Sequence, residues 1–312
     1  MTKSTQPTVI NTGKKHWFRK ELPFHLFLLP AVIIVFIYMY VPMGGLIIAF
    51  QKFIPAKGLF GNQKWIGLDN FIFLYNLPNA MQALRNTVVI AFWKIVLHLV
   101  IPIIVSILLN ELRSAWFRRT CQTLIYLPHF LSWIIFGGIL IDILSPSTGL
   151  VNKFLGVFGI KPIFFLGSND WFPFTIVATD VWKEFGFGTI VYLAAITNID
   201  PTQYEAATID GANRFQRIVH VTLPNMRMII VLMTVLSLGN VLNAGFDQVY
   251  NLYSPQVYET GDILDTFIYR IGLLEAQFGV ATAMGMFKSL VSTLFISVSY
   301  YCAYKFADYR IF

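Results

Sequence analysis

Residues 201–224 read PTQYEAATIDGANRFQRIVHVTLP and form the most polar helical stretch of a strongly hydrophobic chain. The apolar run MIIVLMTVLSL follows almost at once, at residues 228–238. The polar stretch therefore interrupts a sequence that otherwise favours a membrane. Two interpretations are open at this point: an ordinary solvated loop between membrane helices, or a docking element for a soluble partner.

The composition of the chain is that of a membrane protein. Of 312 residues, 56% are hydrophobic and 12% are charged, and the mean hydropathy is +0.64. Soluble domains carry roughly 25% charged residues. The sequence thus predicts a polytopic membrane protein in a lipid bilayer, and its net charge of +7 is expected to reflect loop topology and not nucleic-acid binding.

Six segments are long and apolar enough to cross a hydrocarbon core, which requires about 20 residues. They lie at 24–50, 87–109, 124–144, 172–197, 228–246 and 281–306. The fourth is the weakest, because Asp180, Lys183 and Glu184 interrupt it. The predicted fold class is all-α with six transmembrane helices, and five helices are the alternative.

Lysine and arginine are divided unevenly between the loops on the two sides of these spans. One side holds thirteen: Lys3, Lys14, Lys15, Arg19, Lys20, Arg113, Arg118, Arg119, Arg214, Arg217, Arg227, Lys305 and Arg310. The other side holds seven: Lys52, Lys57, Lys64, Arg85, Lys153, Lys161 and Arg270. The richer side is expected to be cytoplasmic. This predicts a cytoplasmic arm at 1–23, a membrane domain at 24–306 with a cytoplasmic loop at 198–224, and a cytoplasmic tail at 307–312.

The start of the polar stretch has the chemistry of a helix N-terminus. Asp200 is a good N-cap, Pro201 suits the first helical position, and Gln203 suits the third position of a capping box. We expect a short helix over 204–209 and a turn at Asp210–Gly211, where glycine permits a left-handed backbone.

A second short helix is expected to follow the turn. Asn213 can cap it, with Gln216 three residues further on. Pro224 is expected to end it. The stretch therefore predicts helix, turn and helix on the cytoplasmic side.

The same residues resemble the EAA signature of the permeases of ABC importers, the binding-protein-dependent inner-membrane components. The resemblance rests on Glu205-Ala206-Ala207, on Gly211 six residues after the glutamate, and on Val-x-Leu-Pro ending at Pro224, with Val221 where isoleucine is usual. In that family this loop supplies a coupling helix that sits in a groove of the ATP-binding subunit. The resemblance implies a coupling site made of Glu205, Ala206, Ala207, Asp210, Gly211, Leu223 and Pro224.

Other segments resemble permeases that import polysaccharides and oligosaccharides in Gram-positive bacteria. They are NELRSAWFRRTCQTLIYLPHFLSW (110–133), DVWKEFGFGTIVYLAAITNIDPTQYEAATIDGA (180–212), TFIYRIGL (266–273) and ADYRIF (307–312). The resemblance implies the type I ABC importer architecture in a bacterial cell membrane. It also implies four kinds of partner: a second homologous permease, two copies of an ABC ATPase that uses ATP and Mg, an extracellular sugar-binding lipoprotein, and the oligosaccharide. No cofactor is expected on this chain.

Charged groups inside a span cost about 2.5–3.5 kcal/mol each and therefore need a reason. One interpretation is a polar substrate path formed by Asp180, Trp182, Lys183, Glu184, Phe187, Asn240, Asn243, Asp247 and Lys288. The alternative is internal pairs that fix helix packing, such as Asp180 with Lys183. Lys94 and His98 share one face of the second span, where a lone histidine more often bridges helices than binds a ligand.

Motifs of the common enzyme classes are absent from the sequence. It has no G-x-x-x-x-G-K-[ST], HExxH or GxSxG, and we expect no catalytic residue and no metal site. The spacing of Asp180, Glu184 and Asp247 does not favour a hydrolytic carboxylate pair. A permease for another small polar solute and an ion channel stay open as alternatives, although a channel does not explain a docking motif.

Overall fold

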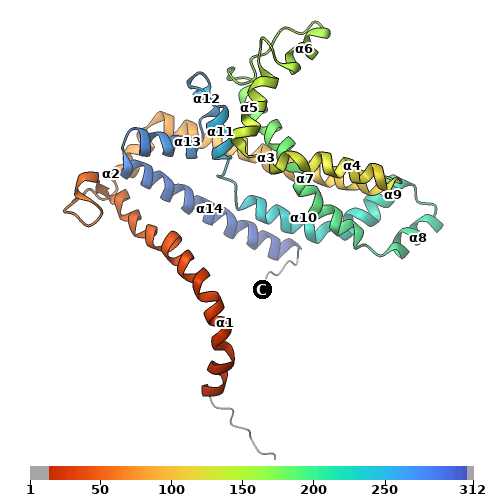
Figure 1. Ribbon diagram of the computed structural model, residues 1–312, viewed down its shortest axis with the longest axis horizontal. Coiled ribbons are helices and arrows are strands. Elements are labelled where there is room, and N and C mark those ends of the chain that lie inside the picture. Colours follow the sequence, from red (N-terminus) through yellow and green to blue (C-terminus); the bar gives the residue numbers. More distant parts are fainter. Residues whose placement is uncertain (1–13, 308–312) are drawn as a thin grey trace, which may run out of the picture.

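The computed structural model describes residues 14–307, and this range is mainly helical with very little strand, as predicted (Figure 1). Strands β1 (Gln51–Lys52) and β2 (Lys64–Trp65) form a short antiparallel hairpin. The helices are α1 (Lys14–Val35), α2 (Asp69–Asn76), α3 (Pro78–Glu111), α4 (Ala115–Tyr126), α5 (Trp133–Leu144), α6 (Leu150–Val157), α7 (Phe172–Thr197), α8 (Pro201–Ile209), α9 (Arg214–Arg217), α10 (Leu223–Leu238), α11 (Phe246–Leu252), α12 (Tyr258–Gly261), α13 (Leu264–Tyr269) and α14 (Phe278–Ala307).

Helices α3 and α7 form the centre of the bundle and pack along each other more extensively than any other pair of described elements. Helix α7 has the bounds predicted for the fourth span. Its apolar residues Ile176, Val177 and Val181 are buried in one cluster with Ile90 of α3 and Phe136 of α5. Two further clusters lie where α3 meets α13 and α14, and where α7 meets α10. The core therefore follows α3 from one end to the other.

The predicted number of six spans is not confirmed. Among the described residues, four helices are long and apolar enough to cross a membrane, and a bent pair raises the number to five. Helix α7 has 26 residues but is not one of these four. Every 18-residue stretch of it contains the three charged residues Asp180, Lys183 and Glu184. These charged side chains face other helices, as described below.

The predicted third span, 124–144, is not one continuous helix. Helices α4 and α5 meet at an angle of 106°, with a 3-10 turn at Leu127–Phe130 between them. Pro128 disfavours a continued α-helix, and the Ser132 hydroxyl accepts a hydrogen bond from Ile135 N as the N-cap of α5. Hydrophobicity along the sequence carries no sign of this break.

The predicted fifth span, 228–246, begins earlier and ends earlier than expected. Helix α10 starts at Leu223 and ends at Leu238. Pro224 does not end the preceding helix, because a π-helical segment at Ile218–Thr222 joins α9 to α10. Such a widened turn accommodates a proline, which has no N–H and whose ring would clash with the carbonyl of His220. The elements α11, α12 and α13 then fold back before α14 begins.

Helix α1 and its continuation stand apart from the bundle (Figure 1). A π-helical segment, Phe36–Tyr40, and a 3-10 segment, Val41–Phe50, extend it. The 30-residue span Glu21–Phe50 is 0% buried within the chain over its most apolar window, and only the Val41–Phe50 segment packs on α14. The predicted arm 1–23 is thus helical from Lys14 onward, and its residues 1–13 lie outside the described range.

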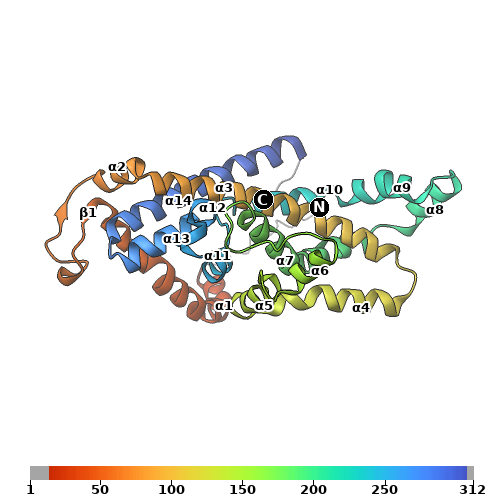
Figure 2. The same cartoon turned by 90° about the horizontal axis from the view of Figure 1, so that it is seen from above.

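The molecule has two distinct ends. Helices α8 and α9 lie at one end, and β1 and α2 lie at the other (Figure 2). Helix α3 connects them. With 34 residues it is about 51 Å long at 1.5 Å per residue, which exceeds the roughly 30 Å of a hydrocarbon core.

Candidate functional site

The N-terminus of α8 is capped as the sequence predicts. Asp200 Oδ1 accepts a hydrogen bond of 2.9 Å from Thr202 N, and Pro201 occupies the first turn. The predicted role of Gln203 in a capping box is wrong. Its side-chain Oε1 accepts a hydrogen bond of 2.8 Å from Asn225 Nδ2 instead. Gln203 therefore fastens α8 to the start of α10.

Gly211 ends α8 in the left-handed conformation, with φ +79°. Gly211 N donates to Thr208 O at 3.1 Å, and Ala212 N donates to Ala207 O at 2.9 Å. These two bonds form a Schellman motif, in which the residue after the C-cap takes positive φ and is usually glycine. The predicted turn is confirmed, and it sets the direction in which the chain leaves α8.

Helix α9 starts with the predicted capping box. Gln216 N donates to Asn213 Oδ1 at 2.9 Å, and Asn213 N donates to Gln216 Oε1 at 2.8 Å. Arg214 of this helix lies 3.8 Å from Glu111 at the end of α3. The capping box thus fixes the residue at which α9 begins, and the Arg214–Glu111 pair connects α9 to the end of α3.

Side-chain contacts hold α8 against the membrane-spanning part of the chain. The Tyr204 hydroxyl lies 3.0 Å from Thr222 Oγ1, and Arg217 Nη1 donates to Thr208 Oγ1 at 3.1 Å. Each contact joins α8 to the segment that leads into α10. These contacts, together with the Gln203–Asn225 bond, connect α8 to the chain that leads into α10.

The outer surface of this loop carries apolar side chains with nothing covering them. Ile209 is 86% exposed and Phe215 is 73% exposed. Glu205 and Ala206 beside them are exposed as well, and Ala207 is half-buried. Ile209 and Phe215 are the most exposed large apolar side chains of this loop.

The Asp200 cap gives a testable pH dependence. The hydrogen bond from Thr202 N lowers the pKa of the Asp200 carboxyl, so this bond stabilises α8 above the ordinary pKa of aspartate and is lost as the pH falls through the lowered value. Asp200→Ala is expected to lower the hydrogen-exchange protection of the α8 amides at neutral pH, whereas Asp200→Ser retains it. Equal protection in Asp200→Ala and wild type would contradict the cap.

A buried polar network joins α3, α7 and α11 in the core. Lys94 Nζ lies 3.1 Å from Asp180 Oδ1 and donates to Ala244 O at 2.7 Å and to Gln248 Oε1 at 2.5 Å. His98 Nε2 lies 3.0 Å from Asp180 Oδ2. Asp180 therefore forms an internal pair, as the second interpretation of these charges allows, but its partner is Lys94 of another helix and not Lys183 of its own.

A second polar cluster lies at the break between α4 and α5. Lys183 Nζ lies 2.7 Å from Glu184 Oε1 and donates to the backbone oxygen of His129 at 3.0 Å. His129 Nδ1 lies 2.6 Å from Glu184 Oε2, and the His129 ring stacks on Phe187 with 4.5 Å between ring centroids. We call His129, Lys183, Glu184 and Phe187 the break cluster.

The break cluster reaches the surface of the chain. The His129 and Glu184 side chains are 30% and 26% exposed, and Trp182, Phe187 and Phe130 at its edge are exposed aromatic residues. Gly186 allows α7 to approach so closely because a Cβ there would lie 2.1 Å from Ile125 O. Polar groups that face hydrocarbon are costly, so this surface needs water, a ligand or protein against it.

The other predicted path residues lie apart from the break cluster. Lys288 of α14 pairs with Asp265 of α13. Asn240, Asn243 and Asp247 are exposed around the turn between α10 and α11, where Gly245 N donates to Asn243 Oδ1 at 3.4 Å. The structure thus brings Lys183, Glu184 and Phe187 together with Trp182 at their edge, places Asp180 in the Lys94 network, and leaves Asn240, Asn243, Asp247 and Lys288 elsewhere.

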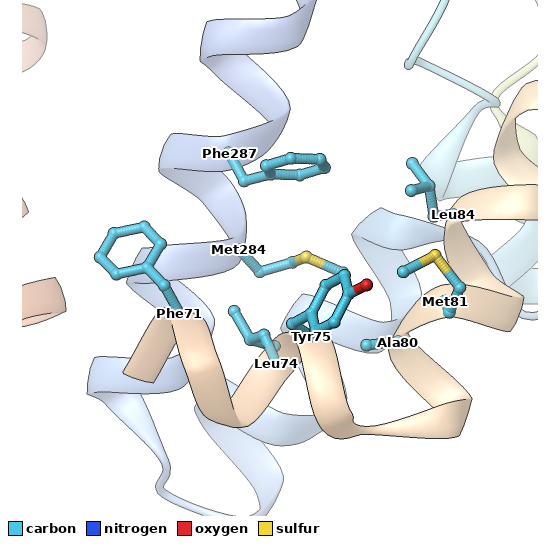
Figure 3. A pocket seen from close by; sticks show the side chains of 8 residues that line it. All are labelled: Phe71, Leu74, Tyr75, Ala80, Met81, Leu84, Met284 and Phe287. Atoms are coloured by element: carbon cyan, nitrogen blue, oxygen red, sulfur yellow. The ribbon is translucent and has the colours of Figure 1, made fainter. Parts of the chain in front are cut away.

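An apolar pocket between α2, α3 and α14 has the wrong chemistry for a polar solute (Figure 3). Its volume is about 160 Å³, and the residues that line it are Phe71, Leu74, Tyr75, Ala80, Met81, Leu84, Met284 and Phe287. The Tyr75 hydroxyl is the one polar side-chain group among them.

Comparisons with known proteins identify the family. Residues 98–310 match the family model described as binding-protein-dependent transport system inner membrane component. The chain belongs to this family of transport permeases. Permeases of this family are transport subunits, so the chain is not an enzyme, and it is a multi-pass membrane protein.

Relatives of this permease carry carbohydrate names. It is 39% identical over 288 residues, 92% of this chain and 89% of the relative, to the polygalacturonan/rhamnogalacturonan transport system permease protein YteP of Bacillus subtilis (strain 168). It is similar, with 36% identity and a TM-score of 0.86, to a chain of a bacterial ABC transporter involved in the import of the acidic polysaccharide alginate, covering 94% of this chain and 99% of that one. A second structure, of a bacterial alginate ABC transporter with an alginate pentasaccharide-bound periplasmic protein, gives a TM-score of 0.85 at 36% identity, covering 92% and 96%.

The permease contains functional candidates that the sequence did not reveal. His129 follows Pro128 at an unpredicted break, and Gln248 lies in a segment predicted only as loop. Their polar partners are 55 and 154 residues away in sequence, beyond the reach of helical periodicity. The one available signal for His129 was the Leu-Pro-His sequence inside an apolar run.

Proposed function

We propose that this permease is one of two membrane subunits of an ATP-driven importer of oligosaccharides or polysaccharide fragments. The observation that carries the proposal is the loop 198–224, whose capped helices present Ile209 and Phe215 to the solvent while their polar side chains bind α10. Relatives named for polygalacturonan, rhamnogalacturonan and alginate support a carbohydrate substrate. Uronate-containing fragments are the substrate class that these names favour.

A separate ATPase docks on α8 and α9 in this proposal. Glu205 provides a polar contact, Ala206 and Ala207 provide a small surface, and Ile209 and Phe215 provide apolar contact area. ATP and Mg are bound by that ATPase and not by this chain. Closure of two ATPase copies would pull α8 and rock α10 against the α3–α7 pair, which alternates access to the path.

A second permease packs against the apolar surface of α1 that the rest of this chain leaves uncovered. The span Glu21–Phe50, made of α1 and its continuation, is long and apolar enough to cross a membrane, yet 0% of its most apolar stretch is buried in this chain. A second subunit that contacts α1 and the exposed break cluster of this chain would complete a substrate path between the two bundles. Both termini are cytoplasmic in this arrangement, and an extracellular lipoprotein delivers the sugar at the opposite end.

The break cluster is the part of the substrate path on which we expect the largest effects. Glu184 and His129 offer charged and polar groups for sugar hydroxyls, and the exposed face of Phe187 suits the apolar face of a sugar ring. Glu184→Gln is expected to lower kcat/KM for uptake roughly tenfold, the size of one hydrogen bond to a charged group. Phe187→Ala is expected to lower it by up to about tenfold through the loss of an aromatic contact. Phe174→Ala, which removes another exposed aromatic residue of α7, is the matched control. Uptake unchanged in both variants would remove this cluster from the path.

The proposal is tested by purification of the tagged chain from gently solubilised native membranes, followed by mass spectrometry. We expect an ABC ATPase and a second permease to co-purify, and vesicles containing the complex to take up oligogalacturonides or alginate oligosaccharides only with ATP. A chain that purifies alone and conducts ions without a partner would favour the channel alternative. ATP-driven uptake of a different polar solute, with no uptake of sugars, would overturn the substrate class.

A further inference from the structure

A polar pocket lies between the first turns of α3 and the short helix α12. It has a volume of about 400 Å³ and is lined by Asn79, Gln82, Tyr258, Glu259, Asp262 and Arg270. None of these residues belongs to the coupling loop or to the break cluster. The size falls within the range of ligand pockets in proteins, about 300–1,000 Å³.

The charges of Arg270 and Asp262 in this pocket neutralise each other. Arg270 Nη1 lies 3.2 Å from Asp262 Oδ1, and Nη2 forms an ion pair with Oδ2. Asp262 is 4% exposed and also accepts a hydrogen bond from Thr266 Oγ1. The Arg270 guanidinium covers one face of the Tyr258 ring at 4.5 Å, and Tyr253 lies against this ring at 5.1 Å. The ring is therefore not free to stack on a sugar.

Helix α12 is held in place from two sides. Gln82 Nε2 donates to Glu259 O at 2.7 Å, and Asn86 Nδ2 donates to Glu259 O and to Asp262 O at 3.1 Å each. On the other side, Thr260 Oγ1 donates to Asn169 O at 3.0 Å. The backbone of Glu259 is thus fixed before any partner arrives, which lowers the cost of binding.

The Glu259 carboxylate is exposed, and among the side chains that the structure describes no cation lies within ion-pair distance of it. Its closest described polar contact is Asn169 Nδ2, at 3.5 Å from Oε2. The side-chain amides of Asn79 and Gln82 line the same pocket, and the Nε2 group of Gln82 already donates to the backbone. The pocket therefore offers acceptors and one uncompensated negative charge, which suits an ammonium or guanidinium group.

The pocket and the coupling loop lie at opposite ends of α3. Gln82 and Asn86 contact α12 near the start of α3, whereas Glu111 contacts Arg214 of α9 at its end. Gln82 and Glu111 are 29 positions apart, which is about 43 Å along the helix, more than a hydrocarbon core. If α8 faces the cytoplasm, the pocket faces the outside, where the binding protein arrives.

We propose that this pocket receives a lysine or arginine side chain of the extracellular sugar-binding protein, with Glu259 as its counter-ion. The inference rests on the proposed function and adds a specific contact to it. A relative's structure contains a periplasmic protein bound to its transporter, which is consistent with a partner at this end. Charge pairs at the edge of an interface mainly steer association and set its salt dependence.

The test compares the affinity of the cognate binding protein, without sugar, for the purified importer in lipid nanodiscs. Glu259→Lys is expected to raise the Kd by about tenfold or more at low salt, and Glu259→Gln by a smaller factor. Both effects are expected to shrink at high ionic strength because the charges are screened. Glu275→Lys, which reverses another exposed carboxylate between α13 and α14, is the control and should leave the Kd unchanged.

The outcomes separate this inference from the proposed function. An unchanged Kd in Glu259→Lys, or a change that salt does not reduce, would overturn the inference while the importer function stands. An effect seen only with the sugar-loaded binding protein would assign the pocket to the saccharide and also overturn it. If the wild-type complex does not bind the binding protein or respond to it, the proposed function fails and the inference fails with it.

Discussion

Replacement of Gly211 by valine is expected to abolish ATP-driven uptake while the chain still folds and inserts. Gly211 has φ +79° in the Schellman motif that ends α8, and a β-branched residue there is a conformational outlier. A Cβ at this position would meet no atom within 4 Å, so the penalty is the backbone strain alone, about 1–2 kcal/mol. The turn relieves that strain by changing φ, which swings α8 away from its docking direction.

Two matched variants separate backbone strain from other effects at this turn. Gly211→Asn adds a side chain that tolerates positive φ and is expected to retain most uptake. Gly138→Val adds the same side chain to a glycine of α5 where a Cβ also meets nothing within 4 Å and φ is not positive. Uptake and ATPase stimulation in reconstituted vesicles measure the outcome. Normal coupling in Gly211→Val would contradict a docking role for the turn.

Lys94→Met is expected to lower the stability of the folded chain by about 3–5 kcal/mol, the cost of removing one partner of a buried ion pair. Lys94 is 7% exposed, and its loss leaves Asp180 without its main counter-ion and Ala244 O and Gln248 Oε1 without their donor. Thermal unfolding in detergent reports the change.

The double variant Lys94→Met with Asp180→Leu is expected to regain part of this stability, because removal of both charges avoids a lone buried carboxylate. Lys288→Met is the comparison at a more exposed pair, since the side chains of Lys288 and Asp265 are each 21% exposed, and its effect should be smaller. A single Lys94→Met variant as stable as wild type would show that the network does not hold α3, α7 and α11 together.

Local sequence chemistry predicted the coupling loop well. Asp200, Gly211 and the Asn213–Gln216 box all act within a few residues of themselves, so their geometry follows from the local sequence alone. Gln203 departs from prediction because Asn225, 22 residues away, competes for its side chain. Pro224 departs because a π-helical turn accommodates it without ending the helix.

Tertiary pairing was not predictable from one sequence. Lys94 and Asp180 are 86 residues apart in the numbering, and helical spacing proposes only neighbours on the same helix, such as Asp180 and Lys183. The break at Leu127–Ser132 and the return through α11–α13 depend on packing against α7 and α3. A hydropathy profile is a mean over many residues, so it does not distinguish either feature from the apolar segments beside it.

The most direct test of the account is photo-crosslinking from position 209 in native membranes. A photoreactive amino acid at position 209, where Ile209 is 86% exposed on α8, should form a crosslink to an ABC ATPase, which mass spectrometry would identify. The additional substitution Gly211→Val should abolish this crosslink. A probe at Leu290, 72% exposed on α14, should not yield the ATPase. An intact importer in which position 209 reacts with lipid or another protein but never with the ATPase would contradict the docking of α8.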